Sequence, residues 1–473
     1  MKFNLLNFVA IIAVCCSLNA QIGIGTIAPD SSSIIDISSS SKGMLTPRMT
    51  TAERVGISNP AEGLMVYDIS LDAFHYFEST SGTWIKLEGA IKRDDYVLVK
   101  SISDFPAIVG GKITLSSNVL YEINGLISLT APIELNGAYL IGSDSNEDIL
   151  LAAGGTIFTG STGGSIRNIT LTAPGGTIFN INNVSGTDNL VIQSAIVANA
   201  SSVGTLQGFN LVFMNVIQYS GNATGITYSN INDLLLNNQG WFPNNGGTYE
   251  TFTGNFSLIQ KISGFSKVVT ATAGMDITGI GVISSDAVME SVVFSGGGNY
   301  VNGSSPYTGY EFSNNWSVDC PGILEETDKV ANGYIYFSAE NSVTTDVITD
   351  NVPVKMEGTT TSGGFFRMNT DSGTNNRIKY AGNKPRAFVV SCSATVERSS
   401  NGSRNVYSLI IYKNGSMVPS IVSEQTFENG VSKGNFNLLG SLTLSTNDYI
   451  EVYISTDNKN IDPTVTRFNM VVQ

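Results

Sequence analysis

A short pattern recurs at nearly constant spacing through the middle of the chain. An Asn or Asp precedes a run of alternating apolar residues, and successive Asn/Asp positions are 20, 21, 21, 23, 22 and 21 residues apart. The positions are Asp148, Asn168, Asn189, Asn210, Asp233, Asn255 and Asp276. A second motif, Gly-Gly-Thr-Ile-Phe, occurs at residues 154–158 and again at 175–179. Periods in this range are typical of solenoids.

Each unit has room for two or three short strands and for no convincing helix. Alternating residues such as Leu190 and Ile192 lie on one face of a strand, and stacking successive units buries that face. The Asn or Asp before each strand suits a corner. A β-sandwich with evenly spaced strands is the alternative, but regularity over seven units favours a parallel β-helix. We therefore predict an all-β chain with a right-handed parallel β-helix over residues 95–322, in coils of about 21 residues. That length gives about eleven coils and a rod of about 50 Å.

Residues 1–20 have the features of a secretory signal peptide. Lys2 gives a positive start, an apolar run extends from Phe8 to Cys16, and Ala20 is a small residue at the predicted cleavage site. The run is too short for a membrane-spanning helix, which needs about 20 apolar residues. A lipoprotein cleaved before Cys15 or Cys16 and an uncleaved tether are the alternatives.

The mature chain is acidic and poor in charge. Charged residues make up 14% of the sequence, and loss of Lys2 changes the net charge from −14 to −15. An acidic chain without a basic patch is a poor binder of nucleic acids. Only Cys320 and Cys392 remain after cleavage. We expect two buried free thiols rather than a disulfide, because the chain is long enough to form a core without one.

Residues 21–94 read as a small N-terminal module. Thr50 and Glu53 have capping-box spacing for a short helix. Residues 64–67 and 74–77 predict a β-hairpin with Trp84 packed beneath it. His75 is the only histidine, which excludes any mechanism that needs two.

The N-terminal module contains three short motifs: Lys-Gly-Met-Leu at 42–45, Pro-Arg-Met-Thr at 47–50 and Gly-Leu-Met-Val-Tyr-Asp at 63–68. They resemble an N-terminal attachment module of secreted surface proteins of Bacteroidetes bacteria and of tail-fibre proteins of their phages. The resemblance implies extracellular or virion placement and says nothing about chemistry.

Pro321-Gly322 marks a boundary, and residues 330–473 predict a separate β domain. Several strand-like runs are joined by turns, and Asn414-Gly415 is a strong hairpin signal. The length and strand order suit a jelly-roll sandwich. The segments 407–415 and 445–452 resemble tumour-necrosis-factor/C1q-like heads. This resemblance implies that the chain forms a homotrimer.

Aromatic residues cluster late in the repeat region among Gly, Asn and Pro, so we expect them on loops. Loop aromatics on a rigid scaffold suit carbohydrate binding by stacking, although packing between loops or subunits is an alternative. The candidate ligand-binding residues are Trp241, Phe242, Tyr300, Tyr307, Tyr310 and Trp316.

The sequence contains no nucleophile elbow, phosphate loop, dinucleotide fingerprint or zinc-ligand cluster. We therefore do not expect an enzyme, with polysaccharide cleavage by paired carboxylates as the one exception. The candidate carboxylates, for which solvated surface positions are the simpler interpretation, are Asp276, Asp286, Glu290, Glu311 and Asp319. We expect no cofactor, although Asp144, Glu147 and Asp148 have the oxygen ligands that a structural Ca²⁺ would need. A charged turn is the simpler interpretation of that cluster.

Together these features predict a trimeric fibre, secreted or virion-borne, that attaches to a cell surface through a glycan or protein receptor. A secreted bacterial adhesin of the same architecture and a β-helix polysaccharide depolymerase are the alternatives.

Overall fold

The computed structural model describes residues 21–87, 95–400 and 402–473. The predicted signal peptide and residues 88–94 lie outside the described residues. The chain divides into two compact units between residues 93 and 94, and each is described by itself.

The N-terminal unit contains two small sheets. Strands β1 (Ile22–Ile24) and β2 (Ile35–Ile37) pair in parallel. The second sheet has the order β3 (Arg48–Met49), β4 (Met65–Asp68), β5 (Ala73–Glu78) and β6 (Thr83–Lys86). β4 and β5 form the predicted hairpin.

Thr50 is the N-cap of a short helix, α2 (Thr51–Val55), and the expected capping box with Glu53 is present. The Arg54 guanidinium donates to the buried Asp68 carboxylate at 2.9 Å, which fixes α2 to β4. His75 is buried in β5, so it has the packing role that a lone histidine in a strand suggests.

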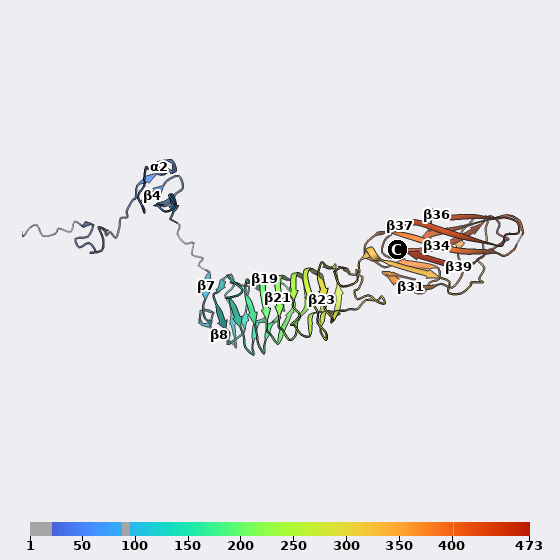
Figure 1. Ribbon diagram of the computed structural model, residues 1–473, viewed down its shortest axis with the longest axis horizontal. Helices are drawn as coiled ribbons and strands as arrows, with labels where there is room; N and C mark the ends of the chain where they lie inside the picture. Colours follow the sequence, from blue (N-terminus) through green and yellow to red (C-terminus); the bar gives the residue numbers. More distant parts are fainter. Residues whose placement is uncertain (1–20, 88–94, 401) are drawn as a thin grey trace, which may run out of the picture. The chain divides into compact units, whose positions relative to one another are not determined.

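The middle of the chain is a parallel β-helix of about nine turns. Its strands stack in three columns, here called faces A, B and C (Figure 1). Face A contains β7 (Tyr96–Val99), β10 (Leu120–Ile123), β13 (Tyr139–Gly142), β16 (Gly164–Arg167), parts of β19 (Asn189–Ala198), β21 (Leu211–Ser220), β22 (Ile226–Trp241) and β23 (Thr248–Lys267), then β25 (Ala287–Glu290) and β28 (Trp316–Asp319).

Faces B and C complete each coil. Face B contains β11 (Leu126–Ser128), β14 (Ile149–Leu151), β17 (Thr170–Thr172), the later parts of β19, β21, β22 and β23, and β26 (Val293–Ser295). Face C contains β9 (Lys112–Thr114), β12 (Ile133–Glu134), β15 (Thr156–Gly160), β18 (Thr177–Asn182), β20 (Ser202–Gln207), the first parts of β22 and β23, β24 (Ala273–Ile283) and β27 (Asn299–Asn302). Strand β8 (Ile108–Val109) forms a hairpin with β9, and the 3₁₀ helix η1 (Ile102–Asp104) precedes it.

The core is made of side chains stacked in register from coil to coil. One inward column of face A runs Val97, Tyr121, Leu140, Ile166, Ile192, Met214, Leu236, Lys261, Met289 and Val318. On face C the rings of Phe158 and Phe179 stack with centroids 5.7 Å apart. These two phenylalanines belong to the repeated Gly-Gly-Thr-Ile-Phe motif, so here the period of the sequence repeat equals the length of one coil.

Elsewhere the coil length varies, and the expectation of eleven coils was wrong. In the face A column the step from Tyr121 to its register partner Leu140 is shorter than the sequence period, whereas the step from Met289 to Val318 is much longer. The recurring Asn/Asp therefore drifts around the coil. Asn168 lies at a corner with a φ of 51°, but Asp233 lies inside β22.

The C-terminal domain is a sandwich of two antiparallel sheets, as expected. One sheet has the order β31 (Thr361–Phe366), β29 (Asn332–Tyr336), β39 (Pro463–Val472), β34 (Arg386–Arg398) and β37 (Lys433–Leu444). The other has the order β32 (Met368–Asn369), β33 (Arg377–Tyr380), β38 (Tyr449–Thr456), β35 (Asn405–Lys413) and β36 (Ser416–Phe427), with β30 (Val354–Lys355) also paired to β38. Asn414 and Gly415 both have positive φ in the turn between β35 and β36, which explains the hairpin signal.

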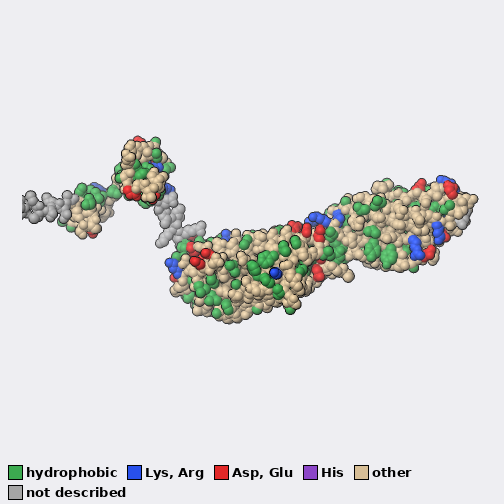
Figure 2. All heavy atoms as spheres, viewed as in Figure 1, with side chains coloured by type: hydrophobic (Ala, Val, Ile, Leu, Met, Phe, Trp, Pro, Cys, Tyr) green, Lys and Arg blue, Asp and Glu red, His purple; other side chains and the backbone are tan. Residues whose placement is uncertain are grey.

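The two predicted free thiols are confirmed. Cys320 lies in the core of the solenoid and Cys392 in the core of the sandwich, and neither forms a disulfide. Few charged side chains are visible on the side of the solenoid shown in Figure 2. No helix among the described residues is long and apolar enough to cross a membrane.

Candidate binding groove at the junction of solenoid and head

The predicted aromatic residues do not form one group. Trp241 and Trp316 are buried, so the expectation that they lie on loops was wrong. Trp241 ends β22 and belongs to an inward column of face B, where its ring stacks on Tyr219 at 3.8 Å between centroids. Trp316 begins β28 and packs against Phe312 in the core. Alternation within the strand, rather than the neighbouring Gly, Asn and Pro residues, decides where these two rings point.

Two other candidates, Phe242 and Tyr300, are partly exposed, and Tyr300 lines a hollow of about 320 Å³ together with Glu311 and Glu326. Phe242 follows β22 with 36% of its surface exposed, and its ring meets Phe265 edge to face. Tyr300 is partly buried against the core, and its hydroxyl donates to the Gly296 carbonyl at 2.8 Å. Their predicted ligand-binding role stays a prediction.

Tyr307 and Tyr310 lie where the last solenoid loop meets the head. Residues 303–315 leave face C after β27 and return to face A at β28. The Tyr310 ring stacks on Phe366 of β31 with centroids 4.0 Å apart, and Tyr307 meets the same ring edge to face at 5.5 Å. The loop is thereby fixed to the head by aromatic contacts.

These tyrosines border a surface groove of about 590 Å³. Its lining combines aromatic rings with amide and hydroxyl groups, which is the chemistry that carbohydrate recognition uses. The residues are Pro306, Tyr307, Thr308, Tyr310, Asn332, Ser362, Gly363, Gly364, Phe365, Met368 and Asn369.

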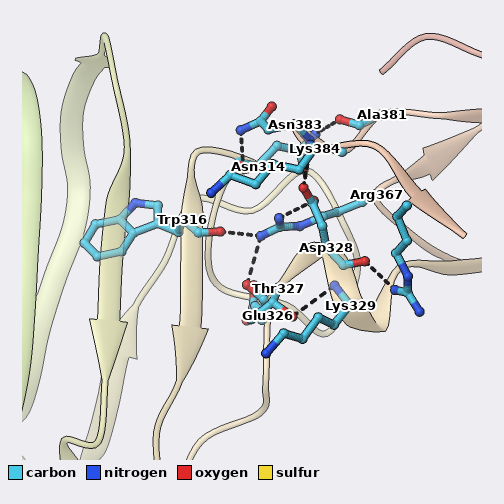
Figure 3. A network of polar contacts seen from close by, with 12 residues as sticks. Asn314, Trp316, Glu326, Thr327, Asp328, Lys329, Arg367, Ala381, Asn383 and Lys384 are labelled. Carbon is cyan, nitrogen blue, oxygen red and sulfur yellow. Dashed lines mark hydrogen bonds and ion pairs between the residues drawn. The ribbon is translucent and has the colours of Figure 1, made fainter. Parts of the chain in front are cut away.

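A buried arginine of the head holds the junction together (Figure 3). The Arg367 guanidinium donates to the main-chain carbonyls of Trp316 and Glu326 and forms an ion pair with Asp328. Its side chain is 2% exposed, and its φ is 54°. Arg367 thus links β28 of the solenoid to the segment that enters the head.

Asp328 and Asn314 extend this network on either side of Arg367. The Asp328 carboxylate accepts the main-chain N–H groups of Asn383 and Lys384 at 3.0 and 2.8 Å. The Asn314 side chain donates to the Ala381 carbonyl at 2.7 Å, and the Asn383 side chain donates to the Asn314 carbonyl at 2.7 Å. These bonds join parts of the chain that are distant in the sequence, so no local sequence pattern indicates them.

Glu326 orders the loop that carries the tyrosines. Its two carboxylate oxygens accept the main-chain N–H groups of Glu311 and Phe312 at 2.8 and 2.9 Å. Burial raises the pKa of Glu326, and the nearby Glu311 adds to the rise, although the two N–H donors and Arg367 oppose it.

Of the five candidate carboxylates, the structure brings two together. Glu290 and Asp319 are exposed and are register neighbours on the outer side of face A. The Asp276 carboxylate accepts its bonds from Thr278 on the outer side of face C, Glu311 accepts the Gly303 N–H at 3.1 Å, and Asp286 is exposed before β25.

The acidic cluster at residues 144–148 forms a solenoid corner. The buried Asp148 carboxylate accepts main-chain N–H groups from Gly125, Ser143 and Asp144 at 2.7 to 2.9 Å. Both of its oxygens are therefore used in shaping the chain, as in the charged turn that we favoured.

Part of the chain matches a known family model, and several solved structures align with the chain at low similarity. Residues 23–103 match the family model of the phage tail like trimerisation region, while no curated protein matches the chain. The tailspike protein of Acinetobacter phage vB_ApiP_P1 is 11% identical, with 91% of this chain and 98% of the tailspike aligned and a TM-score of 0.28. Murine APRIL and Eiger TNF from S. frugiperda are 8% and 10% identical and align with 30% of this chain and with 98% and 91% of their own, with TM-scores of 0.22 and 0.21. At such low identities the fold description rests on the chain's own strand registers.

Proposed function

We propose that this chain is a homotrimeric, phage tail-fibre-like protein that attaches to a cell surface. The match of residues 23–103 to a phage tail-like trimerisation region carries the proposal. The matched region ends at residue 103, inside the first coil, and therefore includes strand β7 of the solenoid. In this proposal the N-terminal unit attaches, the solenoid is a rigid spacer, and the sandwich is a head of the tumour-necrosis-factor/C1q-like type.

The oligomeric state is the first test. Sedimentation of residues 21–473 is expected to give about three times the mass of one chain, which is 50.2 kDa for the full sequence. A species with the mass of a single chain at micromolar concentration would contradict the proposal.

We further propose that the junction groove is the receptor site and that it takes a cell-surface glycan. Tyr307, Tyr310 and Phe365 offer rings for stacking on sugar faces, and Asn332 and Asn369 offer amide groups for hydroxyls. The groove walls come from both the solenoid loop and the head, and Arg367 holds them together, so the site is pre-organised.

Binding to intact host cells tests this assignment. Tyr310→Ala and Tyr307→Ala are each expected to weaken binding about 5- to 30-fold, because the loss of a stacked aromatic contact costs about 1–2 kcal/mol. Phe242→Ala is the matched control, since Phe242 is an exposed loop aromatic outside the groove. Loss of binding in the Phe242 variant alone would move the receptor site to the solenoid. Equal thermal stability of the three variants is required for either conclusion.

The first residue of the mature protein distinguishes a secreted bacterial adhesin from a virion component. Protein beginning at Gln21 in culture medium supports a secreted bacterial adhesin of this architecture. Protein beginning at Met1 in purified particles supports a virion component.

Polysaccharide cleavage is a second candidate function, favoured by the pairing of Glu290 with Asp319. Neighbouring strands lie about 4.8 Å apart, which is close to the separation of roughly 5–5.5 Å between the carboxyl groups of retaining glycosidases. Loss of viscosity when the protein is mixed with host capsule would support this function. Persistence of that loss in Glu290→Gln and Asp319→Asn variants would exclude these two residues as the catalytic pair.

A further inference from the structure

Outward register columns on faces A and C of the solenoid differ in chemistry. On face A the outward residues in one register column are Tyr96, Leu120, Tyr139, Ser165, Val191, Phe213, Leu235, Gln260, Val288 and Ser317. Seven of these ten are aliphatic or aromatic. Tyr96 and Tyr139 are exposed and the other five are half-buried, so the column forms an apolar stripe on the surface, and apolar surface patches mark interaction sites.

Face C has the opposite character at the same levels. Its outward column runs Thr159, Asn180, Thr205, Thr227, Thr251, Asp276 and Asn302. None of these seven is apolar, although the column passes through the same coils as the apolar stripe of face A. The difference therefore belongs to these two columns, not to the coil composition.

The apolar stripe has relief as well as area. Ser165 is a small residue between Tyr139 and Val191 in the register column, and a hollow of about 530 Å³ lies there. Arg167 and Asp188 stand among the lining residues, and polar side chains make up most of the remainder. Tyr139 is 51% exposed beside the hollow.

We propose that face A packs against other copies of this chain and lies toward the axis of the trimer. This inference rests on the proposed homotrimer and adds which surface of the solenoid forms it. It is incompatible with polysaccharide cleavage by Glu290 and Asp319, because that pair stands on the same outer face. The occupant is a second copy because the stripe begins with Tyr96, which is exposed and lies inside the segment that matches a trimerisation region. The stripe continues that region along the solenoid without a break in register.

Cysteine cross-linking tests the assignment within the intact mature chain, residues 21–473. Leu235→Cys places a thiol on face A, and Thr227→Cys places one on face C of the same coil. A short bismaleimide is expected to join two chains through Cys at 235 and not through Cys at 227. The unsubstituted chain is the background control, since Cys320 and Cys392 are buried.

The outcomes separate this inference from the proposed function. A preparation with the mass of one chain contradicts the homotrimer and the inference with it. A trimer that cross-links through position 227 but not through 235 overturns the face assignment alone, and so does equal cross-linking of both.

Charge on each face supplies a second measurement. Phe213→Glu with Leu235→Glu is expected to raise the concentration at which the trimer dissociates at least tenfold relative to Thr205→Glu with Thr227→Glu. The two double variants alter the same two coils by the same charge. Equal dissociation concentrations would overturn the proposal.

Discussion

Lys261 Nζ lies 2.8 Å from Glu250 Oε2 inside the solenoid, and each side chain is 1% exposed. Both residues occupy positions that are apolar in the neighbouring coils. Leu236 and Met289 are the register partners of Lys261 on either side. Ile226 and Met275 are those of Glu250. One coil thus replaces two stacked apolar positions with an ion pair.

Removing one partner of this pair should be far worse than removing both. Lys261→Met leaves the Glu250 carboxylate buried without its cation, and we expect a loss of about 3–5 kcal/mol in the free energy of unfolding. Adding Glu250→Met restores the apolar column, and the double variant should come within about 1 kcal/mol of the unsubstituted chain, or exceed it. Denaturant unfolding of all three variants measures the coupling. A double variant as unstable as Lys261→Met would show that the pair itself stabilises the coil.

The stability of the junction should depend on Arg367. Arg367→Met removes the donors to the Trp316 and Glu326 carbonyls and the ion pair with Asp328. We expect a loss of about 3–5 kcal/mol, because buried acceptors and a half-buried carboxylate lose their partner. Calorimetry should show the head and the solenoid melting as separate transitions in this variant.

Arg404→Met is the matched control for that substitution. Arg404 is 59% exposed and lies 3.9 Å from Glu428, so its loss should change the free energy by about 0.5 kcal/mol or less. Equal effects at the two positions would mean that Arg367 does not couple the head to the solenoid.

The sequence period was enough to predict the class of fold but not the number of coils. The strictly repeated Gly-Gly-Thr-Ile-Phe motif places Phe158 on Phe179, because a strict repeat brings identical side chains into register. Longer corners lengthen later coils, and a drifting Asn/Asp such as Asp233 can fall inside a strand. Stacking tolerates such changes, since each coil needs to match only its neighbours.

The candidate site was predicted in part. Tyr307 and Tyr310 were found because they lie in a Gly/Ser/Pro loop, where side chains are not committed to a core. Trp241 was misplaced because its neighbours Pro243 and Asn244 are loop-like, whereas Trp241 itself ends a strand. Arg367 could not have been found, since its partners Trp316 and Glu326 lie far from it in the sequence.

Acid should weaken the first coils through Asp148. Burial raises the pKa of this carboxyl, but the N–H groups of Asp144, Gly125 and Ser143 outweigh burial and hold the pKa below its ordinary value of 3.8. The carboxylate therefore contributes stability above pH 3.8, and this contribution is lost as the pH falls through the lowered pKa.

Asp148→Asn should cost about 1–3 kcal/mol near neutral pH, because one main-chain N–H loses its acceptor. The difference from the unsubstituted chain should shrink as the pH falls below 3.8. Denaturant unfolding at several pH values measures it, with Glu147→Gln, an exposed neighbour, as the control. A difference that does not change with pH would contradict the role assigned to the charged form.

The thiols of Cys320 and Cys392 should be unreactive in the folded protein. Burial raises the pKa of Cys392 to about 12 and that of Cys320 to about 11, and the thiolate is the reactive species. We expect negligible reaction of native residues 21–473 with a thiol reagent at neutral pH, and two thiols per chain after denaturation without reductant. The Thr227→Cys variant should react rapidly at its added thiol, because position 227 lies on an outer face of the solenoid, and it shows that the reagent is active. Fast native reaction at Cys392 would mean that the sandwich opens on the timescale of the assay, and fewer than two thiols after denaturation would reveal a disulfide.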